Sequence, residues 1–139
     1  MTIATWPNEC KLGAVALKAS GNTTGSTKTV GTAIEVGNGR FLCETKITVL
    51  DVASNDERYT IDIEANSRDA TTTWRRVATV FAGGAKEVTG RDDDDAASEH
   101  QVIVDNPYDY QVRYVIYLVG STATGITSAI NLYPVPRKE

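Results

Sequence analysis

The segment YTIDIEAN, residues 59–66, alternates apolar and polar side chains over its whole length. Its apolar members recur at every second position, which is the period of a β-strand that buries one face and exposes the other. A helix would place Asp62 and Glu64 in the same stripe as their apolar neighbours and would bury two charges at high cost. The segment therefore predicts a half-buried antiparallel strand.

Other segments on both sides extend this pattern along the chain. FLCETKITVL (41–50) places Phe41, Cys43, Ile47 and Val49 on one face. Further strand candidates, rich in β-branched and aromatic residues, are TAIEV (32–36), TWRRVATVF (73–81), QVIVD (101–105), YQVRYVIYLVG (110–120) and ITSAINLYPV (126–135). CKLGAVALKA (10–19) is also compatible with one face of a helix, and we interpret it as a strand or an extended arm.

Turn signals separate these strands. Asn38-Gly39 in VGNGRF favours the positive φ angles of a tight hairpin turn, which predicts a hairpin here. Pro107 in DNPYD has no N–H group and cannot lie in a central ladder, so it separates two strands. SGNTTGSTKT (20–29) is interpreted as a polar loop. Seven or eight short strands at near-regular spacing predict a single all-β domain over residues 1–139, a sandwich or a barrel.

The composition narrows the classes of partner. The chain has 139 residues and a formal net charge of −4, which argues against nucleic acid because that partner favours basic patches. The start MTIATWPNEC lacks the basic residues and the apolar run of a signal peptide. No stretch approaches the length of a membrane helix. We therefore expect synthesis in the cytoplasm, with neither a nucleic acid nor a membrane as partner.

Two cysteines, Cys10 and Cys43, are too few for a disulfide framework. The favoured interpretation is that both are small buried apolar residues. A bridge between them stays open as an alternative, because its geometry cannot be judged from sequence.

The acidic segment GRDDDDAASEHQVIVDN (90–106) is examined as a metal or catalytic site. It lacks the sixth-position glycine of a calcium loop in every frame, and adjacent aspartates of an extended chain point to opposite sides. We interpret it as a solvated loop. The weaker alternative is a loose divalent-cation site, for which the candidate ligands are Asp92, Asp93, Asp94 and Asp95.

Catalytic motifs are not found. His100 follows Ser98 and Glu99, but neighbours along a strand cannot face one another, and a G-x-S-x-G motif is missing. His100 is therefore interpreted as a residue at the rim of the sandwich. FAGGAKE (81–87) has glycines and a lysine without the spacing of a phosphate loop. We expect no enzymatic activity and no cofactor.

The strand candidate at 110–119 is apolar on both faces. One face carries Tyr110, Val112, Tyr114, Ile116 and Leu118. The other carries Val115, Tyr117 and Val119, interrupted by Arg113, which is expected to pair with Asp105 or Asp109. Strands of this kind are covered on both faces. The alternatives are a central core strand, a subunit interface or an aromatic platform for a ligand.

Three segments carry a resemblance to a known family. GTAIEVGNGRFLCETKITV resembles a strand, a GNGR-type turn and a second strand of that family, and YTIDIEANSRDATTTWRRVATV resembles its Y-x-I-x-I…T-W-x-x-V-A stretch. IVDNPYDYQVRYVIYLVGSTATGITSAINLYP resembles its closing stretch. Together, over roughly residues 30–134, they are similar to the small cement (decoration) proteins of tailed-bacteriophage heads, of the type found on a Bordetella short-tailed phage. The acidic insert at 92–99 and the N-terminal segment depart from the family pattern.

The resemblance implies an antiparallel β-sandwich of about eight strands with a jelly-roll-like topology. It implies a virion protein on the outer capsid surface that clamps neighbouring copies of the major capsid protein and forms a homodimer or homotrimer. Catalytic residues are not part of this family. The extended N-terminal segment (1–9), the loop 20–29 and the C-terminal tail (134–139) are candidate contact arms. The interface candidates are Trp6, Tyr108, Tyr110, Arg113, Tyr117, Pro134 and Pro136.

Two other functions are weighed against this expectation, because sandwiches host many activities. The first is a carbohydrate-binding β-sandwich module or a tail-associated adhesin, in which exposed aromatic residues such as Trp74 and Tyr108 would bind glycans. The second is a hydrolase subunit that uses His100, and no motif favours it.

Overall fold

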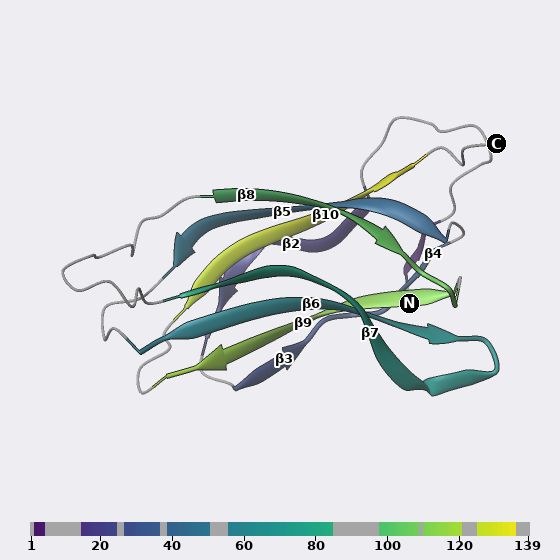
Figure 1. Ribbon diagram of the computed structural model, residues 1–139, viewed down its shortest axis with the longest axis horizontal. Helices are drawn as coiled ribbons and strands as arrows, with labels where there is room; N and C mark the ends of the chain where they lie inside the picture. Colours follow the sequence, from purple (N-terminus) through teal and green to yellow (C-terminus); the bar gives the residue numbers. More distant parts are fainter. Residues whose placement is uncertain are drawn as a thin grey trace.

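The computed structural model describes residues 2–4, 15–24, 27–36, 39–50, 56–84, 98–108, 110–120 and 125–135. These residues form strands joined by turns, and none of them is helical (Figure 1). The ten strands are β1 (Thr2–Ala4), β2 (Val15–Thr23), β3 (Lys28–Val30), β4 (Ile34–Val36), β5 (Arg40–Leu50), β6 (Arg58–Ser67), β7 (Ala70–Gly84), β8 (Ser98–Asp105), β9 (Gln111–Val119) and β10 (Ile126–Pro134).

The strands form two sheets that face one another (Figure 1). One sheet, which we call the β10 sheet, has the order β2-β10-β5-β8. The other, the β9 sheet, has the order β1-β4-β9-β6-β7, and β3 also pairs with β9. Because β3 and β4 pair with successive parts of β9, they act as two halves of one strand. Every pair is antiparallel except β1 with β4.

The connections give the sandwich its topology. From β2 to β10 the chain changes sheet at every step except from β3 to β4, which share one edge, and within the β6–β7 hairpin. With β3 and β4 counted together, this is the eight-strand order of a double-sheet jelly roll. The expected fold class, an antiparallel β-sandwich of jelly-roll type, is confirmed.

The core lies between the sheets, where the alternating side chains meet. Tyr59, Ile61, Ile63 and Ala65 of β6 are each at most 1% exposed, as the alternation of 59–66 predicts. Phe41, Cys43 and Ile47 of β5 and Ile130 and Leu132 of β10 are equally buried in the opposite sheet. Burying a large aliphatic or aromatic side chain contributes about 1.5–3 kcal/mol, so these facing rows stabilise the sandwich.

The polar face of β6 differs from the prediction, because two of its residues are buried. Asp62 is 5% exposed and Asn66 is 1% exposed. The Thr79 hydroxyl of β7 donates to Asp62 Oδ1 at 2.7 Å, and Asn66 Nδ2 donates to Thr71 O and to Gln111 Oε1, each at 2.8 Å. Since β6 lies between β7 and β9, neighbours on both sides cover and satisfy these polar groups.

The predicted hairpin at Asn38-Gly39 is wrong. The strand before it, β4, pairs with β1 and β9, whereas the strand after it, β5, pairs with β10 and β8. The two strands therefore lie in different sheets, and Gly39 O accepts a hydrogen bond from Asn106 N instead. The predicted loop 20–29 is also too long, since β2 continues to Thr23 and β3 begins at Lys28.

Candidate functional site

The outward face of β9 carries an apolar stripe. Val112, Ile116 and Leu118 point into the core, so Val115, Tyr117 and Val119 lie on the opposite face. Val30 of β3 is in register with Val115 and extends the stripe sideways. Val30 is 44% exposed and Val119 is 59% exposed, whereas Tyr117 is half-buried and Val115 is 0% exposed. We call Val30, Val115, Tyr117 and Val119 the β9 stripe.

Charged residues border this stripe on the neighbouring strands. Lys28 is in register with Tyr117, and its ammonium lies 5.8 Å from the centre of the ring. On the other side, Arg58 of β6 is opposite Val119. An apolar centre with a charged rim is the usual composition of a protein–protein contact.

Arg113, with a glutamate and a tryptophan beside it, lies at one end of the stripe. Arg113 donates from Nε and Nη2 to Glu64 Oε1 at 3.0 and 2.8 Å, and its guanidinium lies 4.1 Å from the centre of the Trp74 ring. The expected partners were Asp105 or Asp109; Asp105 instead pairs with Arg40 at 3.3 Å, and Asp109 lies outside the described residues. Glu64 is directly opposite Arg113 in the β6–β9 ladder, and sequence reasoning did not anticipate this register.

The other interface candidates lie elsewhere. Tyr110 is half-buried beneath Arg68, whose guanidinium is 4.4 Å from its ring centre, and Tyr108 packs against the core. Pro134 is buried at the end of β10 opposite Phe41, so its side chain is not exposed to a partner. Trp6 and Pro136 lie outside the described residues. Of the interface candidates that the structure describes, Arg113 and Tyr117 share the outward face of β9.

The expected contact arms are described only in part. Within the N-terminal segment 1–9, residues Thr2–Ala4 form β1 along the edge of β4. Within the tail 134–139, residues 134 and 135 are described, and the remainder lies outside the described part of the chain.

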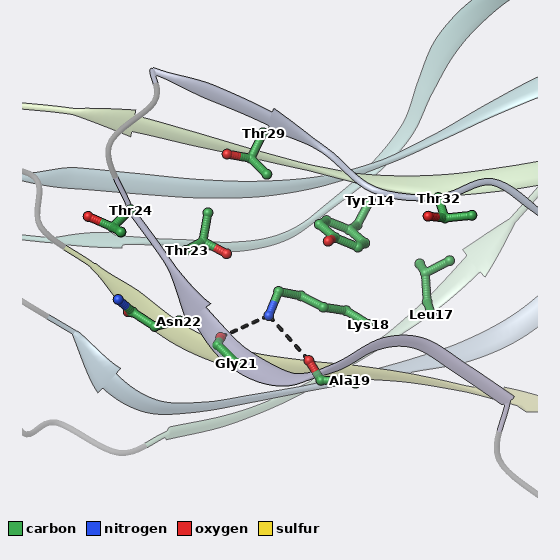
Figure 2. A pocket seen from close by; sticks show the side chains of 10 residues that line it. All are labelled: Leu17, Lys18, Ala19, Gly21, Asn22, Thr23, Thr24, Thr29, Thr32 and Tyr114. Carbon is green, nitrogen blue, oxygen red and sulfur yellow. Dashed lines mark hydrogen bonds between the residues drawn. The ribbon is translucent and has the colours of Figure 1, made fainter.

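A polar groove opens on the side of the sandwich where β2 and β3 form the sheet edges (Figure 2). Its volume is about 550 Å³. The residues that line it are Leu17, Lys18, Ala19, Gly21, Asn22, Thr23, Thr24, Thr29, Thr32 and Tyr114. Sequence reasoning missed this groove, because a lysine in an ambiguous segment carries no signal of its position in the fold.

Lys18 lies at the inner wall of the groove and is only 8% exposed. The β2–β10 register shifts on both sides of Ile130, which is opposite Lys18, and this irregularity leaves Leu17 and Lys18 both buried. The Lys18 ammonium donates to Gly21 O and Ser128 O at 2.9 Å and to Ala19 O at 3.3 Å. Burial lowers the pKa of Lys18, and it raises the pKa of Tyr114 across the groove.

The predicted metal and catalytic candidates do not form a site in the described residues. Asp92, Asp93, Asp94 and Asp95 lie outside them, and within them no group of three His, Cys, Asp or Glu side chains is arranged to hold a metal ion. His100 packs edge-on against Phe81, with ring centres 5.0 Å apart. Its Nε2 lies 2.9 Å from Ser98 Oγ, so the expectation that these two side chains cannot meet is wrong, because residues two apart on a strand share a face.

Two further expectations concern the cysteines and membranes. Cys43 is a free, buried thiol, and Cys10 lies outside the described residues. Burial raises the pKa of the Cys43 thiol to about 11, with a smaller contribution of the same sign from Glu44 and an opposing one from the hydrogen bond with Thr45. The described residues contain no apolar helix of membrane-spanning length.

Comparison with models of known protein families gives no match, and comparison with curated proteins finds no relative of this chain.

Proposed function

We propose that this chain is a virion structural protein, a cement or decoration protein that binds the outside of a phage capsid. It stabilises the shell by clamping neighbouring major capsid subunits, and it acts without catalysis. The sequence resemblance over roughly residues 30–134 suggests this role. The β9 stripe and its charged rim are the observation that links this role to particular residues.

The composition of this face favours a protein partner. Val30 and Val119 are large aliphatic residues at 44% and 59% exposure, although most large apolar side chains of the described residues are buried. Trp, Tyr and Arg are the residue types that dominate binding energy at interfaces, and Trp74, Tyr117 and Arg113 lie together on this face. Exposed apolar side chains with a charged rim on one face favour an interaction site there.

The scaffold also suits a role in a repeated lattice. A jelly-roll sandwich is a fold found in viral capsid and lectin domains. Copies arranged over an icosahedral shell bind through many equivalent contacts, and a homodimer or homotrimer engages several of them at once. Multivalent attachment raises the apparent affinity by a factor of about 10²–10⁴ when the geometry permits it.

The proposal is tested by mixing the purified protein with undecorated phage heads and pelleting the heads. We expect the protein to co-sediment at micromolar concentration and the decorated heads to resist heat or low salt better than bare heads. Val119→Asp and Val30→Asp should each reduce the bound fraction at least tenfold, because burying an unpaired carboxylate at a contact is costly.

Ile103→Asp is the matched control. Ile103 lies on β8 of the opposite sheet and is 45% exposed, nearly the same as Val30. This variant should bind like the unmodified protein. Loss of binding in Ile103→Asp alone would place the contact on the other face, and no binding by any form would reject the capsid role. Sedimentation equilibrium of the free protein measures whether it forms the expected dimer or trimer.

A further inference from the structure

The groove between β2 and β3 has the size and lining of a small-molecule site. Its volume of about 550 Å³ is within the range of about 300–1,000 Å³ that ligand pockets occupy. The Lys18 side chain runs along its inner wall, and Tyr114 lies on the opposite side (Figure 2). Four threonines and one asparagine supply most of the remaining polar groups.

The charge in this groove has no counter-charge among the described residues. Lys18 forms no ion pair with another described residue, unlike Arg40, Lys46, Arg68 and Arg113. Within the described part of the chain, the ammonium donates to backbone carbonyl oxygens. A buried charge is unfavourable unless it is paired, and the lowered pKa of Lys18 reflects that cost. An anionic group in the groove would relieve it.

An anion would compete for the most weakly held N–H group of Lys18. An ammonium has three donors, and two are held by the short bonds to Gly21 O and Ser128 O. The third bond, to Ala19 O, is long at 3.3 Å, and a carboxylate oxygen would replace it.

Hydroxyl groups line the groove and favour a ligand with many hydroxyls. The side chains of Thr23, Thr24, Thr29 and Thr32 make no hydrogen bond with another described residue, so their O–H groups can donate and accept. The same holds for the Tyr114 hydroxyl. The Tyr114 ring is fixed against Gly31, where a Cβ atom would lie 2.1 Å from a ring carbon. This gives the groove one rigid aromatic wall.

A peptide strand is a poorer occupant, although two sheet edges border the groove. A strand that adds to an edge needs a regular ladder of free N–H and C=O groups. The register shifts of β2 around Lys18 and the inward-pointing charge are devices that protect edges from such pairing. A compact ligand that contacts side chains is hindered neither by the register shifts nor by the inward-pointing charge.

From these observations we propose that the groove of Lys18, Tyr114 and the four threonines binds an acidic sugar, with its carboxylate on the Lys18 ammonium and its hydroxyls on the threonines. This site is distinct from the β9 stripe, and the proposal does not depend on capsid binding.

The test uses methyl β-D-glucuronide and methyl β-D-glucoside, which differ only in a carboxylate in place of a hydroxymethyl group. Each is titrated into the full-length, isotope-labelled protein and followed by amide chemical shifts. We expect the glucuronide to bind with millimolar affinity, to shift the Gly21, Thr29 and Gly31 amides, and to bind about tenfold more tightly than the glucoside, because the charge-assisted hydrogen bond is lost with the neutral sugar.

Two variants are each paired with a matched control. Lys18→Met should bind both sugars equally weakly, whereas Lys46→Met, which removes an exposed lysine from β5 of the same sheet and outside the groove lining, should leave binding unchanged. Thr29→Val should weaken glucuronide binding about fivefold through loss of one hydroxyl, and Thr72→Val on β7 should not. If Lys18→Met does not fold, the comparison of Thr29→Val with Thr72→Val still tests the proposal.

Three outcomes would overturn the proposal. The first is equal affinity of the unmodified protein for the two sugars. The second is amide shifts that map away from the groove, and the third is binding of an extended threonine-rich peptide along β2 with no binding of either sugar. Capsid binding is measured separately, so failure of one proposal does not affect the other.

Discussion

Cys43 is a thiol that is fully buried between the sheets, and its environment opposes ionisation. Burial raises its pKa from 9.0 to about 11. Between these values the unfolded chain loses the thiol proton while the folded chain keeps it, so the unfolded state binds fewer protons. Stability must therefore fall as the pH rises through this window.

This predicts a measurable difference between the unmodified protein and Cys43→Ala. Urea unfolding at pH 8 and pH 10 should show that the unmodified protein loses about 1 kcal/mol more stability over this interval than the variant, because one pKa unit corresponds to about 1.4 kcal/mol. Other groups titrate in both proteins and cancel in the comparison. Parallel loss of stability in the two proteins would mean that the Cys43 thiolate is tolerated in the fold.

The Arg113–Glu64 ion pair is a second side-chain interaction, and its coupling energy can be measured. Its side chains are 20% and 12% exposed, and Arg113 also stacks on Trp74. A double-mutant cycle with Arg113→Met and Glu64→Gln should give a coupling energy of about 1–2 kcal/mol in urea unfolding. The Arg40–Asp105 pair, at 49% and 79% exposure, is the control and should give less than about 0.5 kcal/mol. Equal couplings would show that the partial burial of the first pair has no energetic effect.

At the scale of the element, the turn after β9 depends on one glycine. Gly120 has a φ of +136°, a conformation that side-chain-bearing residues rarely adopt, and a Cβ atom there would lie 2.9 Å from Glu57 Cα. Gly120→Ala should therefore destabilise the protein by about 1–3 kcal/mol in thermal or urea unfolding. Gly21→Ala is the control, since its Cβ would meet nothing closer than 3.9 Å, and it should be neutral or up to about 1 kcal/mol stabilising. A neutral Gly120→Ala would show that the turn can rearrange.

Individual strands and turns show how much of the structure can be predicted from the sequence. The alternation in β6 predicted its buried face, because the two-residue period of a strand is a local property. The hairpin predicted at Asn38-Gly39 was wrong, because a turn signal does not say whether the next strand pairs with the previous one or crosses to the other sheet. The groove at Lys18 was not predicted, since it depends on a register shift between β2 and β10, strands more than 100 residues apart.

At the scale of the whole molecule, the jelly-roll order separates strands that are neighbours in sequence. Among the described strands, only β6 and β7 form a local hairpin, whereas β10 pairs with β2 and β5 from the first half of the chain. Closing a long loop costs entropy before the contacts it creates become favourable, so such pairings form late. The β6–β7 hairpin and its contacts are therefore expected to form the folding nucleus.

Ile63 of β6 and Ile130 of β10 allow a matched test, since both are 0% exposed. Ile63→Val and Ile130→Val should each cost about 0.5–1.5 kcal/mol. Ile63→Val should mainly slow folding, with a φ-value of about 0.5–0.8, whereas Ile130→Val should mainly speed unfolding, with a φ-value of about 0–0.3. Stopped-flow chevron plots measure both rates, provided that each variant loses more than about 0.6 kcal/mol. The reverse order of φ-values would mean that the long-range β10 pairing forms first and that loop closure does not limit the folding of this sandwich.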